Sequence, residues 1–371
     1  MDAGIRWIDT QEGLESLVSE IAGSSFALDT EADSFHHYHE KVCLVQITAG
    51  CGDVLVDPLA GIDLEPLRRP LEDASIRKIL HGADYDVRIL HRDFRFAPRG
   101  IFDTMIAARL TGETAFGLAP LLEAHLNVRL DKAHQRADWS IRPLPVAMAD
   151  YAVADTRHLH ALAAILEARL EALGRLDWAK EEFERIEVVR WKNGEEPSPD
   201  AWRRTKGATS LDRRALAVLR ELWRWRDATA RAKDRPPFKV LRDEALVAVA
   251  RKRPANRSEL EKVEGIFPGF VRSSGAPALL DAVARGVAVP EDELPPPFED
   301  RRIRPDPEFE RRVAVLKSKR DAVALELGLE PGVIGGRALL EAIQRRIDAG
   351  EDPAATPDLR AWQWNLIGPE A

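Results

Sequence analysis

The stretch Phe26-Ala-Leu-Asp-Thr-Glu-Ala-Asp-Ser-Phe, residues 26–35, joins an apolar strand-forming run to a pair of carboxylates. Residues i and i+2 of a β-strand project from the same face, so Asp29 and Glu31 point the same way while Thr30 points back. Alone, such an acidic pair is typical of a solvated strand edge. Its meaning depends on acidic residues elsewhere in the chain.

Two later segments supply those residues. His81-Gly-Ala-Asp-Tyr-Asp ends on Asp86 near the start of a predicted helix, and a later helical run carries Tyr151 and Asp155. Residues i and i+4 of a helix share a face, so four carboxylates and a phenol can converge on one spot. Four carboxylates do not share a dry site as anions unless cations join them. The pattern therefore predicts two divalent metal ions, Mg²⁺ or Mn²⁺, at a site for in-line attack on phosphodiesters.

Composition indicates an ordinary globular protein of two or three domains. The chain has 371 residues, of which 45% are hydrophobic and 31% are charged. It shows neither a signal peptide nor an apolar run of the roughly 18 residues that a membrane span requires. Cys43 and Cys51 are its only cysteines, which fits a reducing cytoplasm. We expect a cytoplasmic protein without a membrane partner, most simply a monomer.

The net charge of −8 conceals a strong asymmetry along the chain. Residues 1–200 carry 22 basic and 35 acidic side chains, whereas residues 201–290 carry 20 basic and 10 acidic ones. Residues 291–371 are acidic again, with 12 basic and 17 acidic side chains. The basic middle segment predicts a polyanion-binding surface separate from the acidic site.

Strand patterns lie early in the chain and helical patterns lie later, which predicts an α/β core with a mixed sheet. The predicted strands are Ile5–Ile8, a strand that begins at Phe26 and ends in Asp29-Thr-Glu31, and residues 42–48, 53–57 and 77–81. A helix is expected over Asp84–Phe94. From Asp103, a plausible N-cap, the pattern is helical, with helices expected over Thr104–Leu110 and, as one helix, residues 145–173. Beyond residue 205 we find only helical patterns, which predict two small bundles.

The acidic segments together resemble the tyrosine-bearing branch of the DEDD exonuclease superfamily. Residues 26–35, 79–90 and 151–159 resemble its three motifs, and Leu44-Val-Gln-Ile and residues 102–110 also match. The two bundles resemble the HRDC domains (helicase and RNase D C-terminal) of the ribonuclease D family. The first bundle resembles them around residues 212–286, and the second only by its position and helical texture.

This resemblance implies an RNase H-like α/β exonuclease domain followed by two all-α, HRDC-like domains. The implied organisation is an exonuclease domain at 1–192, a linker at 193–207, a basic HRDC-like domain at 208–289, a Pro-rich linker at 290–307 and a second HRDC-like domain at 308–371.

The resemblance also implies a role for each catalytic residue. Asp29, Glu31 and Asp155 would hold the metal that activates the attacking water. Asp29 would bridge to a second metal near the leaving 3′ oxygen, which Asp86 would support directly or through water. The hydroxyl of Tyr151 would orient the water, because a phenol with a pKa near 10 is a weak base at neutral pH.

The implied activity is 3′→5′ hydrolysis of structured RNA, such as tRNA precursors, with release of 5′-nucleoside monophosphates. The same chemistry on DNA is one alternative. An inactive RNA-binding adaptor is another, which the presence of all five catalytic residues disfavours.

Several neighbouring residues invite a different interpretation. Asp84 suits the first turn of a helix, and Asp150 points away from Tyr151 toward solvent. Asp33 follows the expected end of its strand. The cluster His36, His37 and His39 is typical of a substrate-side loop more than of a zinc site.

An arginine-rich helix in the basic segment is the candidate RNA-binding element. Arg220, Arg224 and Arg231 lie roughly along one face of it, and we predict that they contact RNA. Trp223 and Trp225 diverge on the same helix, so at least one is expected in the core and the other is available for stacking on a base.

Overall fold

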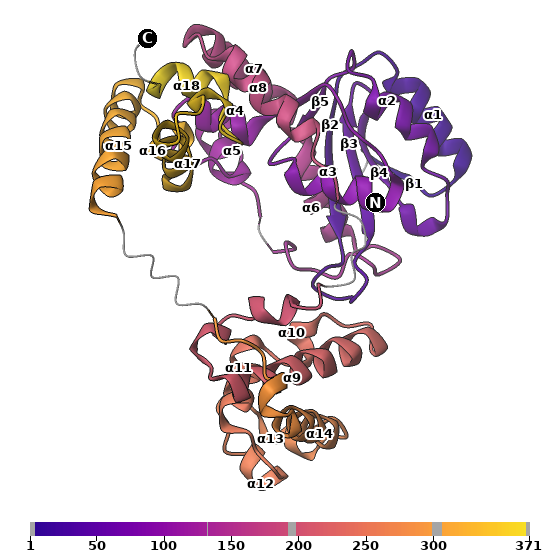
Figure 1. Ribbon diagram of the computed structural model, residues 1–371. Helices are drawn as coiled ribbons and strands as arrows, with labels where there is room; N and C mark the ends of the chain where they lie inside the picture. The colour runs from indigo at the N-terminus through magenta and orange to yellow at the C-terminus, as the bar shows by residue number, and fades with distance from the viewer. Residues whose placement is uncertain (1–3, 132, 192–197, 299–305, 369–371) are drawn as a thin grey trace. The chain divides into compact units, whose positions relative to one another are not determined.

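The computed structural model describes residues 4–131, 133–191, 198–298 and 306–368 and contains two compact units (Figure 1). The first unit is built from the described parts of residues 1–32, 42–191 and 302–371. The second is built from those of residues 33–41 and 192–301. No helix in these described ranges is long and apolar enough to cross a membrane.

A six-stranded mixed sheet lies at the centre of the first unit. Its strands are β1 (Ile5–Ile8), β2 (Phe26–Ala32), β3 (Val42–Ala49), β4 (Gly52–Val56), β5 (Lys78–Leu80) and β6 (Ile101–Asp103). They follow the order β1-β4-β3-β2-β5-β6, and β3 runs antiparallel to both of its neighbours while the remaining pairs are parallel. The mixed sheet predicted from the sequence is confirmed.

Helices cover both faces of this sheet. The spacing of apolar residues along each helix explains which face of that helix is buried. In α1 (Gln11–Ile21), Leu14, Leu17 and Ile21 are buried at intervals of three and four residues. The other helices of the exonuclease region are α2 (Arg68–Glu72), α3 (Asp84–Phe94), α4 (Thr104–Leu110), α5 (Leu118–Leu126), α6 (Val146–Arg157), α7 (Leu159–Ala172) and α8 (Leu176–Glu187). The helix expected over residues 145–173 is thus divided at His158 into α6 and α7.

Asp103 connects three of these elements. Its carboxylate accepts hydrogen bonds from the amides of Met105 and Ile106 and so caps α4, as the sequence predicted. It also accepts from the amides of Gly82 and Ala83, which lead into α3. A single buried side chain therefore fixes the starts of α3 and α4 beside the ends of β5 and β6.

The C-terminal helices pack on the exonuclease region. They are α15 (Pro307–Leu327), α16 (Pro331–Ile334), α17 (Arg337–Asp348) and α18 (Ala361–Ile367). Their buried residues share one apolar cluster with those of α4, α5, α7 and α8. Trp362 stacks on Trp178 with 4.9 Å between ring centroids, and Arg175 donates to the carbonyls of Leu110 and Leu327. The structure therefore differs from the expected second free-standing bundle, because these helices lack a separate core within the described residues.

The second unit is helical and has its own core. It contains α9 (Arg213–Ala232), α10 (Pro237–Val240), α11 (Asp243–Lys252), α12 (Arg257–Leu260), α13 (Pro268–Arg272) and α14 (Gly275–Ala288). Gly286 of α14 lies so close to α9 that an added Cβ would be 2.4 Å from the Cα of Val218. The predicted linkers, residues 193–207 and 290–307, lie partly outside the described residues. Residues 198–207 and 290–298 join this core, since Trp202 is buried and Arg203 donates to the carbonyl of Pro296, whereas Asp306 and Pro307 begin α15.

Candidate active site

Three carboxylates converge above the middle of the sheet. Asp29 and Glu31 come from β2 and Asp155 from α6, and one oxygen of each lies within 4.8 Å of the others. In the described part of the chain, no other group of acidic, histidine or cysteine side chains has this geometry. The strand and helix spacings predicted from the sequence therefore bring these three residues together.

Helix α6 is held over the sheet by its buried face. Ala152, Val153 and Thr156 are buried, and the Thr156 hydroxyl is hydrogen-bonded to that of Thr48 on β3 at 2.8 Å. Asp155, next to this anchor, is thereby directed toward β2. The helix period places Tyr151 one turn earlier on the same flank.

Asp86 lies beside the three carboxylates but outside their 4.8 Å group. It is buried in the first turn of α3 and accepts a short hydrogen bond from the hydroxyl of Thr30. Thr30 was expected only to point away from Asp29 and Glu31. The structure gives it a further role, which is to hold the fourth carboxylate.

The electrostatics of the site show strong mutual repulsion. Burial, followed by the charges of Asp86, Asp155 and Glu31, raises the pKa of Asp29 well above its usual range. Burial and the nearby carboxylates raise the pKa of Glu31 to about 9. Burial raises the pKa of Asp155 to about 6 and that of Asp86 to about 7. In the described part of the chain, no neighbouring cation offsets this repulsion.

Tyr151 lies among polar and aromatic groups from the segment before α6. Burial and the charges of Asp155, Glu31 and Asp29 raise the pKa of its phenol, while a hydrogen bond from the side chain of Gln135 opposes this shift. The rings of His134 and Trp139 lie 5.8 and 6.0 Å from that of Tyr151, centroid to centroid. A cavity of about 280 Å³ opens here, lined by Tyr151, Asp155 and His134 among others.

Gln46 is a further polar group at the base of the site. It pairs directly with Asp29 across β2 and β3, so the two side chains share one face of the sheet. Gln46 is fully buried, yet neither its amide nitrogen nor its oxygen has a hydrogen-bond partner among the described residues. Buried polar groups normally have partners, so an unpartnered amide next to four repelling carboxylates fits a hydrated metal site.

Sequence reasoning missed Gln46, Gln135 and His134. Gln46 lies in a strand that reads as apolar, and Gln135 precedes Tyr151 by 16 residues without regular spacing. Neither periodicity nor composition links such positions to the acidic residues.

The neighbouring acidic residues lie as expected. Asp84 is in the first turn of α3 and forms an exposed ion pair with Arg88 at 2.7 Å. Asp150 is exposed on α6. Asp33 follows β2, is buried, and accepts from the amide of Lys41.

The histidine-rich loop belongs to the second unit and contacts the C-terminal end of α9 and the start of α10. His37 pairs with Asp234 at 2.6 Å, and the hydroxyl of Tyr38 donates to Asp227 at 2.7 Å. His36, His37 and His39 are not part of any metal-ligand group within the described residues.

The three predicted RNA-binding arginines each lie near a carboxylate. Arg220 and Arg224 share Glu221, and Arg231 lies 4.0 Å from Asp227. Arg224 and Arg231 remain about half exposed. Trp225 is buried in the core and Trp223 is partly buried against it, which confirms the core expectation for at least one of them.

Comparison with known proteins identifies the family. Residues 5–171 match the family described as 3′-5′ exonuclease, and residues 215–283 match the HRDC domain. Ribonuclease D of Gluconacetobacter diazotrophicus is 33% identical over 369 residues, which cover 98% of this chain and 91% of that protein. The chain belongs to the ribonuclease D family.

Solved structures agree with this assignment to the ribonuclease D family. The Escherichia coli enzyme, described as an exoribonuclease involved in structured RNA processing, has a TM-score of 0.72 and 30% identity, covering 98% of this chain and 96% of that one. A protein from Bifidobacterium adolescentis has a TM-score of 0.84 and 27% identity, covering 98% and 94% of the two chains.

Membership of the ribonuclease D family makes the chain a hydrolase of the 3′→5′ exoribonuclease type. The exonuclease family depends on metal ions, and the carboxylate cluster offers the oxygen ligands that such ions require. The resemblance inferred from the sequence motifs is thereby confirmed.

Proposed function

We propose that the chain removes 5′-nucleoside monophosphates from the 3′ ends of structured RNAs such as tRNA precursors, using two Mg²⁺ or Mn²⁺ ions. The observation that carries this proposal is the convergence of Asp29, Glu31 and Asp155 within 4.8 Å, beside Asp86 and Tyr151. A cytoplasmic location and a monomeric state stay predictions from the sequence.

The five residues divide the work by position. Asp29, Glu31 and Asp155 would hold one ion, and Asp29 with Asp86 would hold the other. When bound, the ions neutralise the charge that develops on the phosphate and align the attacking and leaving oxygens. Burial and the repulsion between the four carboxylates raise their pKa values. Bound cations would relieve this repulsion and so favour the ionised carboxylates that the ions need as ligands.

Tyr151 positions the attacking water. Its phenol stays protonated near neutral pH because burial and the nearby carboxylates raise its pKa. Gln135 donates to the phenol oxygen, so the hydroxyl proton remains available to a water or phosphate oxygen. His134 and Trp139 beside the ring restrict its motion and leave the cavity for the terminal nucleotide.

The second unit would bind the RNA backbone outside the acidic site. A cavity of about 600 Å³ lies between α10, α11 and the turn before α13, and its lining includes Phe267, Lys239 and Arg242. Phe267 is 59% exposed and packs edge-on against Phe270 beneath it. Exposed aromatic rings beside cations are the usual platform for single-stranded nucleic acid. We therefore propose this groove as an RNA contact in addition to Arg220, Arg224 and Arg231.

Two sets of charge reversals separate these surfaces. One variant combines Lys239→Glu and Arg242→Glu, and the other combines Arg220→Glu, Arg224→Glu and Arg231→Glu. Charge reversal of the set that contacts RNA should reduce the steepness of the plot of log affinity against log salt concentration by about 0.7–0.9 per lost phosphate contact. A groove variant with unchanged affinity and slope removes the groove from the interface.

The activity itself is tested with a 3′-hydroxyl RNA and a DNA of matched sequence. We expect Mg²⁺-dependent release of 5′-monophosphates from RNA, abolished by EDTA. Faster release from DNA would favour the DNA exonuclease alternative. RNA binding without any release, at every metal tested, would favour the adaptor alternative.

A further inference from the structure

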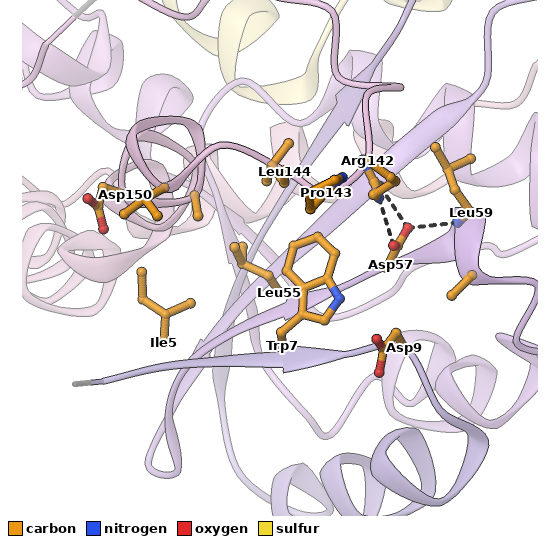
Figure 2. A pocket seen from close by; sticks show the side chains of 13 residues that line it. Ile5, Trp7, Asp9, Leu55, Asp57, Leu59, Arg142, Pro143, Leu144 and Asp150 are labelled. Atoms are coloured by element: carbon orange, nitrogen blue, oxygen red, sulfur yellow. Dashed lines mark hydrogen bonds and ion pairs between the residues drawn. The ribbon is translucent and has the colours of Figure 1, made fainter. Parts of the chain in front are cut away.

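A further cavity, of about 450 Å³, lies along α6 next to the cavity near the carboxylate cluster. Figure 2 shows its apolar floor, in which Ile5 and Trp7 of β1 and Leu55 of β4 lie beside Leu144. Trp7 pairs with Leu55 in the β1–β4 register, so both project from the same face of the sheet. Strand β1 is an edge strand, which leaves this end of the face open to solvent.

Arg142, the one cation among the described lining residues, is unavailable to a ligand. Arg142 donates through Nε and Nη2 to both oxygens of Asp57, and its remaining hydrogens reach the carbonyls of Trp139, Ile141 and Cys43. All five guanidinium donors are therefore used within the protein. Asp57 is likewise buried and also accepts from the amide of Leu59.

Two carboxylates remain to meet a ligand. Asp9 and Asp150 line the cavity and are exposed, and neither side chain has a hydrogen bond or ion pair within the described residues. Figure 2 shows Asp150 and Asp9 at opposite ends of the apolar floor, with Leu55 and Trp7 between them. The lining thus has three aspartates against one arginine, which is already neutralised by Asp57.

We propose that this cavity binds a linear alkyl diammonium ion, with its methylene chain over Trp7 and Leu55 and one ammonium at each of Asp9 and Asp150. The apolar floor favours methylenes over a polar chain. The two terminal carboxylates favour a cation at each end. The guanidinium of Arg142 already lies 5.4 Å from the centroid of the Trp7 ring, so the indole contributes apolar surface for the methylenes and not a site for an ammonium. Anions, including RNA phosphates, are disfavoured because Arg142 has no donor left for them.

The site is separate from the metal centre but shares α6 with it. Val146 and Ala149 line this cavity, Ala147, Tyr151 and Asp155 line the one near the cluster, and Asp150 lines both. Its occupancy is therefore measured by binding alone and does not rest on the proposed reaction.

Calorimetric titration of the full chain with octamethylenediamine tests the proposal. The titration is run with saturating Mg²⁺, so that ammonium groups do not occupy the carboxylate cluster, and is repeated without Mg²⁺. Octylamine and octamethylene glycol keep the chain but remove one or both charges, and we expect each lost charge to weaken binding roughly two- to fivefold. Shortening the diamine to putrescine should weaken it by about three- to fourfold per buried methylene removed.

Matched variants locate the site. Asp9→Asn and Asp150→Asn should each weaken diamine binding roughly two- to fivefold. Ala149→Leu, which fills the cavity without changing charge, should remove it. Asp281→Asn, an exposed aspartate of the second unit, is the control and should have no effect.

Three results would overturn the proposal. One is glycol or monoamine binding as tight as that of the diamine, which would point to a neutral ligand or to a single lysine side chain of a partner. The second is unchanged binding in Asp9→Asn, Asp150→Asn and Ala149→Leu, each with the melting temperature of the native chain. The third is binding that Mg²⁺ abolishes, which would place the diamine at the metal centre.

Discussion

Asp29 interacts with the charges of the other three carboxylates, since Asp86, Asp155 and Glu31 all raise its pKa. In the proposed mechanism it bridges both metal ions. Asp29→Asn should therefore abolish hydrolysis while RNA binding, measured with a labelled RNA, is largely retained. Hydrolysis at more than a few per cent of the native rate contradicts this role.

Asp84 and Asp86 provide an internal comparison two residues apart. Asp86 is buried against Thr30, whereas Asp84 is exposed with Arg88. Asp86→Asn should lower the hydrolysis rate far more than Asp84→Asn. The reverse order would show that the wrong aspartate has been assigned to the site.

Tyr151 acts by position, so its removal should slow the reaction without emptying the metal site. We expect Tyr151→Phe to lower kcat by roughly 10²–10⁴-fold, the usual range for a group in proton-transfer chemistry, with little change in RNA affinity. Gln135→Leu should cause a smaller loss of the same kind. Mg²⁺ binding, followed by the rise in melting temperature, should be unchanged in both variants. A Tyr151→Phe enzyme with normal turnover would exclude the phenol from the mechanism.

The four carboxylates also predict how stability depends on pH without metal. Folding raises their pKa values above the ordinary range near 4, to about 6, 7 and 9 for Asp155, Asp86 and Glu31. The folded chain thus retains protons that the unfolded chain releases. Stability from these groups is full below their ordinary pKa values and is lost as pH rises through the folded ones.

The melting temperature in EDTA should therefore fall between about pH 5 and pH 9, a window set by these pKa values. Saturating Mg²⁺ should flatten the fall, because cations stabilise the ionised carboxylates. Asp29→Asn, which removes one charge, should flatten it in part even in EDTA. A native profile that is equally steep with and without Mg²⁺ would show that other groups control it.

At the scale of single residues, strand and helix periods placed Asp29 on one face with Glu31 and Tyr151 on one face with Asp155, and the resemblance to the DEDD exonucleases joined the two pairs at one site. The period of a strand or helix shows which of its side chains share a face, and metal ligands from one element must share a face. They do not show which hydroxyl or amide completes the cluster. Thr30 and Gln46 were therefore identified only from the pairing of β2 with β3 and from the packing of α3.

Among the elements, α3 depends on a residue outside itself. Asp103 bonds the amides of Gly82 and Ala83 as well as those that start α4, and it is almost fully buried. Asp103→Ala should cost about 2–4 kcal/mol, since it removes a cap and leaves buried amides unpaired. It should also slow hydrolysis, because α3 carries Asp86.

Asp306→Ala is the matched control, since Asp306 caps α15 at the surface by accepting from the amide of Glu308. It should cost about 1 kcal/mol with an unchanged rate. Urea midpoints and initial rates measured on the same samples compare the two variants. Equal losses of stability, or a normal rate in Asp103→Ala, would show that Asp103 does not position α3.

Helices with a clear apolar period were predicted well. Very short strands, and breaks between two helices whose apolar spacing is continuous, were not. The sequence predicted Asp84–Phe94 and Thr104–Leu110 with the observed bounds. It missed β6, because a strand of three residues has no detectable period. It also missed the break at His158, because apolar spacing continues from α6 into α7.

At the scale of the whole molecule, the C-terminal helices were the main surprise. Their apolar residues were expected to face one another in a separate bundle. Instead, Ile343 and Ile367 are fully buried in the cluster that also contains Leu166 and Leu170 of α7. Sequence pattern shows that a helix has an apolar face but not which face covers it.

A chain that ends at Phe298 should therefore be destabilised in its exonuclease region. The loss of Trp362, Ile343 and the other buried residues would expose the apolar surfaces of α4, α5, α7 and α8. We expect the melting temperature to fall by more than about 10 °C, since each kcal/mol corresponds to about 2–4 °C in a unit of this size. An unchanged melting temperature would mean that the shared core adds nothing to stability.

Replacing residues 198–298 with a flexible Gly-Ser linker is the complementary change, because it removes the helices of the second unit and keeps residues 33–41 and the shared core. This chain should retain Mg²⁺-dependent hydrolysis of short single-stranded RNA, since all five proposed catalytic residues and their supporting contacts lie in the first unit. It should bind tRNA-like RNA more weakly, because the segment 201–290, with 20 basic and 10 acidic side chains, is lost. Its salt slope should be shallower by about 0.7–0.9 for each phosphate contact removed. If affinity for tRNA-like RNA and the salt slope both stay at native values, the basic unit serves a partner other than the substrate.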